Sequence, residues 1–202
     1  MNKKEDLLRL KIFIVSYLDF KSIAGTEKVL LVFSNWAKSK GHYIYFVSFL
    51  HELHNEVTNE FKNKNISRIK CKKSNVIIQL FKYLIGIDSS KCYYKNFSDI
   101  LKINGKPDVI LALDAALLPN IKRALNKSQM DSKTVSWFHN TLIYPLKNPK
   151  GKLRNIIRKF REPRLLRSAN AHLAISNEIK NQILRFVPSA KVYTVFNPLE
   201  PY

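Results

Sequence analysis

The stretch between residues 11 and 49 constrains the fold of this chain more than any other. It begins with a short apolar run, Lys11 to Ser16, of the kind that forms a strand buried on both faces. A turn of small residues, Ala24-Gly25-Thr26, leads into a segment whose apolar residues recur with the period of a helix: Val29, Phe33, Trp36 and Ala37. Gly41 ends this helix, and Tyr43 to Phe49 is a second strand-like run. The stretch predicts a β-α-β unit whose glycine turn lies where a phosphate could meet a helix N-terminus.

Strand and helix patterns continue to alternate along the remaining sequence. The runs that predict strands are Ile66 to Cys71, Val109 to Leu113, Thr134 to Phe138, Ala171 to Ile175 and Val192 to Phe196. The segments that predict helices are Val76 to Ile85, Phe97 to Ile103, Leu117 to Leu125, Leu153 to Phe160 and Ile179 to Phe186, the last with Ser176 as its N-cap. This alternation predicts an α/β fold with a Rossmann-like, doubly wound and mostly parallel sheet flanked by helices. We expect a single domain over residues 1–202.

The formal net charge of +20 and the pI near 10 are the outlying values in the composition. They indicate anionic partners: nucleic acid, an anionic membrane surface, or phosphorylated and acidic substrates. No run reaches the length of a membrane span, and no secretory signal precedes the first strand. We therefore expect a cytoplasmic protein, either free or peripheral on the cytoplasmic membrane face.

The two cysteines, Cys71 and Cys92, lie far apart in the sequence without the spacing of metal ligands. Isolated thiols in a reducing compartment fit this pattern, and a disulfide is the alternative. We expect no metal site.

Two features lie where ligands bind in open α/β sheets, beyond the carboxyl ends of strands. At the first, the turn at Gly25 and Thr26 would let backbone N–H groups approach a diphosphate, although the G-x-G-x-x-G and phosphate-loop patterns are absent. The alternative is a tight connection that needs Gly25 for its backbone geometry. At the second, His139 follows the strand Thr134 to Phe138. It is either a functional imidazole or a histidine hydrogen-bonded in a loop.

A long basic segment, residues 147–167, combines apolar residues with cations. The apolar residues Leu153, Ile156, Ile157 and Phe160 share one face of a predicted helix. Cations occupy its other positions: Lys152, Arg154, Arg158, Lys159 and Arg161. The pattern suits a helix lying on an anionic bilayer, and equally an ordinary surface helix with a solvated basic face. Pro163 limits the length of this helix.

Two other classes of function fit the sequence less well. Nucleic-acid binding would explain the charge, but the chain has no zinc-ligand spacing, RNP-like aromatic strand or recognisable helix-turn-helix. Nucleophilic hydrolysis lacks a G-x-S-x-G elbow and an obvious serine–histidine pair. We therefore expect no specific nucleic-acid partner.

Four motifs follow one another along nearly the whole chain. They are Ala24-Gly25-Thr26-Glu27-Lys28-Val29, Lys40-Gly41-His42, the sequence Ala-Asn-Ala-His-Leu-Ala-Ile-Ser at 169–176, and Val195-Phe196-Asn197-Pro198-Leu199. In this order they resemble the patterns G-G-x-E-R-V, K/R-G-H, A-D-x-v-i-a-v-S and v-i-y-N-P-i-d. Those patterns mark the N-terminal domain of retaining glycosyltransferases of family 4.

The resemblance implies a GT-B enzyme, in which two Rossmann-like domains enclose the active site. Such enzymes transfer a sugar from a nucleotide-sugar with retention and without an obligatory metal, so the donor substrate is expected and no cofactor. The N-terminal domain mainly binds the acceptor, a cell-surface glycan or a lipid-linked molecule. By analogy, Gly25 and Thr26 approach the donor diphosphate, and His139 holds hydroxyls near the donor sugar and the acceptor. Asp114 and Asn140 would contact the acceptor or substrate.

The chain departs from the family's pattern in two places. Ala24 stands where the family has its first glycine, so the backbone approach is less open. The chain also stops where the family begins its second domain, which carries an E-x7-E carboxylate pair and basic residues that grip the diphosphate. We therefore expect half of a hexosyltransferase, inactive without a separate C-terminal domain. The alternatives are a non-catalytic module that partners a transferase and a basic nucleic-acid-binding protein.

Overall fold

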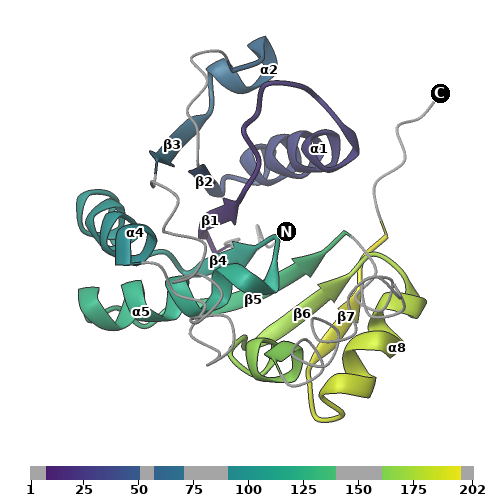
Figure 1. The fold of residues 1–202 in the computed structure, drawn as a ribbon. Coiled ribbons are helices and arrows are strands. Elements are labelled where there is room, and N and C mark those ends of the chain that lie inside the picture. Colours follow the sequence, from purple (N-terminus) through teal and green to yellow (C-terminus); the bar gives the residue numbers. More distant parts are fainter. Residues whose placement is uncertain (1–7, 51–56, 71–90, 140–160, 197–202) are drawn as a thin grey trace, which may run out of the picture.

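The computed structural model describes residues 8–50, 57–70, 91–139 and 161–196, which form a helix-covered sheet (Figure 1). The sheet has seven strands in the order β3-β2-β1-β4-β5-β6-β7. Each pair of neighbouring strands is parallel. The predicted α/β class with a Rossmann-like, doubly wound sheet is confirmed.

The elements alternate along the chain as the sequence predicts. The strands are β1 (Lys11–Ser16), β2 (Tyr43–Leu50), β3 (Asn65–Lys70), β4 (Val109–Ala112), β5 (Lys133–Phe138), β6 (Ala171–Ala174) and β7 (Val192–Thr194). The helices are α1 (Gly25–Ser39), α2 (Asn59–Lys62), α4 (Lys91–Asn104), α5 (Leu118–Ser128) and α8 (Asn177–Phe186), with a 3-10 turn, η1 (Ala115–Leu117), before α5. None of these helices is long and apolar enough to cross a membrane.

The sheet is buried on both faces around β1, an interior strand that is apolar on both sides. Phe13 and Val15 join one core cluster, which includes residues of α4, α5 and α8. Ile12 and Ile14 join the other, together with residues of α1 and α2. Since alternate side chains of a strand point to opposite faces, this near-continuous apolar run supplies both cores at once.

The chain changes its direction of progress across the sheet between β1 and β4. β2 and β3 lie on one side of β1, whereas β4 to β7 lie on the other. In open α/β sheets, ligands bind at such a switch point, beyond the carboxyl ends of the strands. We call the side on which the strands end the carboxyl edge, and the side on which they begin the amino edge.

Three details differ from the sequence prediction. The helix expected at Phe97 to Ile103 already begins at Lys91, because Tyr93 is buried and stacks on Phe49 of β2 at 4.8 Å. The last strand ends at Thr194 rather than Phe196, which is 70% exposed. Trp36, predicted on the buried face of α1, is 53% exposed because the buried stripe passes through Leu30, Ser34 and Ala37 instead. The helices predicted at Val76 to Ile85 and Leu153 to Phe160 lie outside the described residues.

Cys92, in the first turn of α4, is disulfide-bonded. The expectation of an isolated thiol is therefore wrong for this residue, while Cys71 lies outside the described residues. Separation in the sequence is a poor guide here, because α4 packs beside β3 although the two elements are far apart along the chain.

Ser176 caps α8 as predicted, since its Oγ accepts a hydrogen bond from the N–H of Ile179 at 3.2 Å. Ser176→Ala removes this acceptor, and we expect the free energy of unfolding to fall by about 1 kcal/mol. Urea denaturation followed by far-UV circular dichroism measures the loss. Ser176→Asp retains an acceptor and is the control; an equal loss in both variants would contradict a capping role.

Candidate functional site at the carboxyl edge

Three adjacent strands bring the described candidate residues to the carboxyl edge. β1 leads into the turn before Gly25 and Thr26, β4 is followed by Asp114, and β5 is followed by His139. These strands are neighbours in the order β1-β4-β5. Residues that are more than a hundred positions apart in the sequence therefore share the edge around the switch point.

The N-terminus of α1 has no side-chain cap. Ala24 occupies the N-cap position with φ −95° and ψ −174°, and its methyl group offers no acceptor. The first helical hydrogen bond joins the N–H of Lys28 to the carbonyl of Ala24 at 3.0 Å. The N–H groups of Gly25, Thr26 and Glu27 consequently have no intrahelical partner, and they carry the positive end of the helix dipole. An anion is the natural ligand for such a helix end.

The backbone at Gly25 does not itself require glycine. Its φ lies outside the left-handed region, and a Cβ added there would meet no atom within 4 Å. Gly41, at the other end of α1, differs in having φ +82°. The alternative interpretation, a tight connection that needs Gly25, therefore finds no support in the geometry. What glycine provides at this position is uncovered backbone.

A buried aromatic residue, Phe20, anchors the loop that precedes α1. Its ring lies 5.6 Å from that of Phe46 in β2 and 4.6 Å from that of Phe61 in α2. Phe20 has φ 59°, a left-handed conformation that is rare for a bulky residue, so tertiary packing must hold it there. The hydroxyl of Ser48 also donates to the carbonyl of Leu18 in this loop. Sequence reasoning missed Phe20 because phenylalanine is not a turn residue; Ser16 at the end of β1 and Ser48 near the end of β2 were the available signal.

His139 is a half-buried, neutral imidazole. Burial lowers its pKa to about 4, and its ring lies 4.8 Å from that of Trp137. Trp137 in turn packs edge-on against Phe33 of α1 at 5.5 Å, which ties His139 to the helix of the glycine turn. Nε2 of His139 is buried and has no hydrogen-bond partner among the described residues. Because protein covers Nε2, a ligand hydroxyl would have to reach the ring from another side.

Asp114 has a structural role at the same edge. Its Oδ1 accepts a hydrogen bond from the N–H of Ala116 at 2.8 Å and so caps η1. The side chain is exposed, and the predicted contact with an acceptor stays a prediction. Among the residues that the structure describes, no three His, Cys, Asp or Glu side chains are grouped to hold a metal ion.

The other predicted residues lie mostly outside the described part of the chain. These are Asn140 and four cations of the basic segment, Lys152, Arg154, Arg158 and Lys159. Arg161 begins the described residues 161–166, which are helical, and it is partly exposed. The structure therefore places Gly25, Thr26, Asp114 and His139 after neighbouring strands at the carboxyl edge, and their roles, like that of the basic segment, stay predictions.

The structure contains a serine–histidine pair that the sequence did not reveal. Ser136 of β5 and His172 of β6 are direct neighbours in the sheet register, and the Ser136 Oγ lies 2.6 Å from the His172 Nδ1. Both side chains are almost fully buried, and burial lowers the pKa of His172 to about 4. A substrate has no access to this pair, so it joins two strands rather than forming a nucleophile. Only the register of two strands, which the sequence does not state, could have indicated it.

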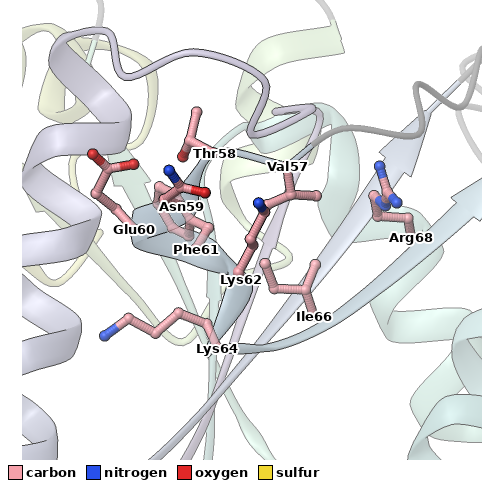
Figure 2. Close-up of a pocket in the computed structure, with 9 residues that line it drawn as sticks. All are labelled: Val57, Thr58, Asn59, Glu60, Phe61, Lys62, Lys64, Ile66 and Arg68. Atoms are coloured by element: carbon pink, nitrogen blue, oxygen red, sulfur yellow. The ribbon is translucent and has the colours of Figure 1, made fainter.

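A pocket of about 860 Å³ lies over α2 and β3, at one side of the sheet (Figure 2). It is lined by Val57, Thr58, Asn59, Glu60, Phe61, Lys62, Lys64, Ile66 and Arg68. None of the candidate residues at the carboxyl edge lines it. Three cations and one carboxylate give the lining a positive balance, which would favour an anionic group over a cation.

Comparison with solved structures identifies the fold. The apo form of the lipopolysaccharide outer core galactosyltransferase WaaB is 21% identical, with a TM-score of 0.68 over 94% of this chain and 46% of its own. Sucrose-phosphate synthase from Thermosynechococcus elongatus is 12% identical, with a TM-score of 0.65 over 93% of this chain and 48% of its own. Anabaena HepE in complex with UDP and glucose is 11% identical, with a TM-score of 0.59 over 95% and 45%.

These structures are GT-B glycosyltransferases, and the predicted likeness to one half of that fold is confirmed. The chain spans less than half the length of each of them. At such identities the likeness shows the fold alone. No family model and no curated protein matches the sequence.

The two buried histidines should make stability depend on pH. Their pKa values are lowered from 6.5 to about 4, so between these values the unfolded chain binds protons that the folded chain does not. We therefore expect the free energy of unfolding to fall as the pH decreases from 6.5 towards 4. Urea denaturation at a series of pH values measures the slope. His139→Gln should lower the slope of the free energy of unfolding against pH by an amount that corresponds to at most one bound proton. An unchanged slope in that variant would contradict the effect of burial on His139.

Proposed function

We propose that this chain is the acceptor-side half of a retaining glycosyltransferase. It would transfer a hexose from a nucleotide-sugar to a cell-surface glycan or a lipid-linked acceptor, without a metal. The observation that carries the proposal is the bare N-terminus of α1, with unobstructed backbone at Gly25, placed at the switch point of a GT-B-like half. Anabaena HepE, a neighbour in fold, has been crystallised with UDP-glucose.

The contribution of this half to the reaction would be electrostatic stabilisation of the leaving diphosphate. Departure of a nucleoside diphosphate leaves negative charge on the leaving group, which N–H dipoles fixed in advance stabilise at little cost in reorganisation. The N–H groups of Gly25 and Thr26 would face that diphosphate. The anchoring of the preceding loop by Phe20 supports this role, because the dipoles then need not be reoriented when the donor binds.

His139 and Asp114 would act on hydroxyl groups. An imidazole that is neutral at pH 7 can accept or donate a hydrogen bond without adding a charge, which suits the positioning of sugar hydroxyls. The exposed Asp114 and the adjacent Asn140 would contact the acceptor. Contact between Trp137 and both His139 and α1 supports joint positioning of the imidazole and the glycine turn.

A bulky side chain at Gly25 should block the donor without harming the fold. In Gly25→Leu we expect the affinity for UDP-glucose to fall about tenfold or more, since the leucine occupies the space through which a phosphate would approach. The free energy of unfolding should stay constant or rise by up to ~1 kcal/mol, because leucine is the better helix former. Titration of the ¹⁵N-labelled chain with UDP-glucose, followed by amide shifts at residues 25–27, measures binding.

The matched control is Asn126→Leu. Asn126 is an exposed residue of α5 and is not one of the candidate site residues. This variant should bind UDP-glucose as the wild type does. Amide shifts that are absent at residues 25–27, or that survive in Gly25→Leu, would overturn the assignment of the turn to the donor.

Turnover should require a second domain of the kind that the solved neighbours contain. We expect the 202 residues alone to release UDP from UDP-glucose no faster than a blank, with or without a glycan acceptor, because one wall of a two-domain cleft cannot surround the donor. A coupled UDP-release assay measures this. Rapid transfer by the chain alone would contradict the proposal. A chain that binds no nucleotide-sugar but binds an intact transferase would instead be a non-catalytic module.

A further inference from the structure

The pocket over α2 and β3 lies apart from the candidate site at the carboxyl edge. Its lining comes from residues 57–62, which lead into and form α2, and from residues of and next to β3 (Figure 2). Because alternate residues of a strand share a face, Ile66 and Arg68 lie on one face of β3. Ile66 packs there against the core cluster that contains residues of α1 and α2. The pocket shares no lining residue with the glycine turn.

Contacts with neighbouring elements fix the wall of this pocket. The N–H of Thr58 donates to the carbonyl of Phe20 at 3.0 Å. The ring of Phe61 is fully buried and lies 4.6 Å from the ring of Phe20. On the side of α1, Nζ of Lys64 donates to Oδ1 of Asn35 at 2.5 Å. A wall that is ordered in advance loses little conformational entropy when a ligand binds.

The lining carries an excess of positive charge. Its cations are Lys62, Lys64 and Arg68, and its one carboxylate is that of Glu60. Burial, and after it the charge of Lys38, lower the pKa of Lys64. The amide oxygen that Lys64 contacts in α1 brings no negative charge to offset this. An anion in the pocket would therefore reduce the repulsion between neighbouring cations.

Two of these cations are suited to hold a phosphate group. The side chains of Lys62 and Arg68 extend to the same side of the ribbon in Figure 2, whereas that of Lys64 extends towards α1. An ammonium group has three N–H donors and a guanidinium group has five, so together they can serve the three oxygens of a phosphate monoester.

The pocket is too large for a phosphate group alone. Its volume of about 860 Å³ lies in the range of pockets that take small organic ligands, roughly 300–1,000 Å³. Val57 and Ile66 are partly exposed and offer apolar surface, and the exposed Asn59 offers an amide for hydrogen bonds. These residues suit the organic part of a ligand whose anionic group lies at the cations.

We propose that this pocket binds a small phosphate monoester, with the phosphate group at Lys62 and Arg68. The organic part would lie against Val57, Asn59 and Ile66. A phosphate monoester carries about two negative charges at pH 7, so it offsets more of the positive lining than one carboxylate would. The ligand would be neither the donor nor the acceptor of the proposed reaction. The inference goes beyond the proposed function, because the pocket would bind such a ligand whether or not the chain takes part in sugar transfer.

Titration of the ¹⁵N-labelled chain with ribose 5-phosphate, without UDP-glucose, tests the inference directly. We expect saturable amide shifts at residues 57–68 and none at residues 25–27. Ribose should cause no shifts because it lacks the anionic group. Inorganic phosphate should bind about fivefold or more weakly than ribose 5-phosphate, since it leaves the remaining lining without contacts.

Variants that change the charge in opposite directions test the assigned residues. Lys62→Gln/Arg68→Gln should weaken the binding of ribose 5-phosphate about tenfold or more, because charge-assisted hydrogen bonds are lost. Lys62→Gln alone, at an exposed position, should weaken it about threefold or more. Glu60→Gln should strengthen binding about twofold or more, because the carboxylate no longer repels the phosphate. Loss of folding would not imitate a gain in affinity.

The matched control is Lys122→Gln/Lys127→Gln. It removes two charges from exposed positions of α5, which packs on the other face of the sheet. At physiological ionic strength it should bind ribose 5-phosphate within about twofold of the wild type, because distant charges are screened.

Several results would overturn the inference. Shifts at residues 25–27 instead of 57–68 would assign the phosphate to the glycine turn. Inorganic phosphate that binds as tightly as ribose 5-phosphate would assign the pocket to the free ion. An equal loss in the α5 control and in Lys62→Gln/Arg68→Gln would attribute binding to the net charge alone. Wild-type affinity in both Lys62→Gln and Glu60→Gln would exclude the pocket as the site.

Discussion

The burial of β1 on both of its faces is the constraint on which the rest of the structure depends. Phe13 and Val15 enter one core while Ile12 and Ile14 enter the other, so neither layer of helices can pack without this strand. Because β2 and β4 pair with its two sides, the chain must leave in one direction and return in the other. The turn of Gly25, Asp114 and His139 follow β1, β4 and β5 around the switch point that results.

In the loop after β1, one residue, Phe20, fixes the backbone, and another, Ala24, leaves the start of α1 open to a ligand. Phe20, held in a left-handed conformation by Phe46 and Phe61, fixes the loop at a distance from the helix end. Ser176 caps α8 and Asp114 caps η1, whereas Ala24 at α1, Thr58 at α2 and Leu117 at α5 supply no side-chain cap. The start of α1 differs from the other uncapped helix ends in its place at the switch point, after a loop that Phe20 fixes.

The periodicity of apolar residues alone predicted the strands of the sheet and most helices. This is because the burial of doubly buried strands and of amphipathic helices determines the order of apolar and polar residues along the sequence. What it could not supply was contact between distant segments. Ser136 and His172 meet only because β5 and β6 pair in one register, and the longer start of α4 follows from Tyr93 stacking on a residue of β2. The exposure of Trp36 and the disulfide at Cys92 likewise depend on packing between elements. At the site, the sequence located Gly25, Asp114 and His139 through strand ends, but the anchoring by Phe20 had no local signature.

The net charge indicates that this chain binds another anion besides a nucleotide-sugar at the carboxyl edge. A nucleoside diphosphate sugar carries about two negative charges, one for each phosphate group, whereas the chain has a formal charge of +20. A donor at the glycine turn would leave most of that charge in place, and self-repulsion of this size disfavours a compact domain unless it is offset. A polyanionic partner can offset it, provided that it contacts the cations. The described cations are not gathered at one place: Lys38 lies at the end of α1, Lys62, Lys64 and Arg68 line the pocket over α2 and β3, and Lys122 and Arg123 lie on α5, so this charge can be offset over a broad surface.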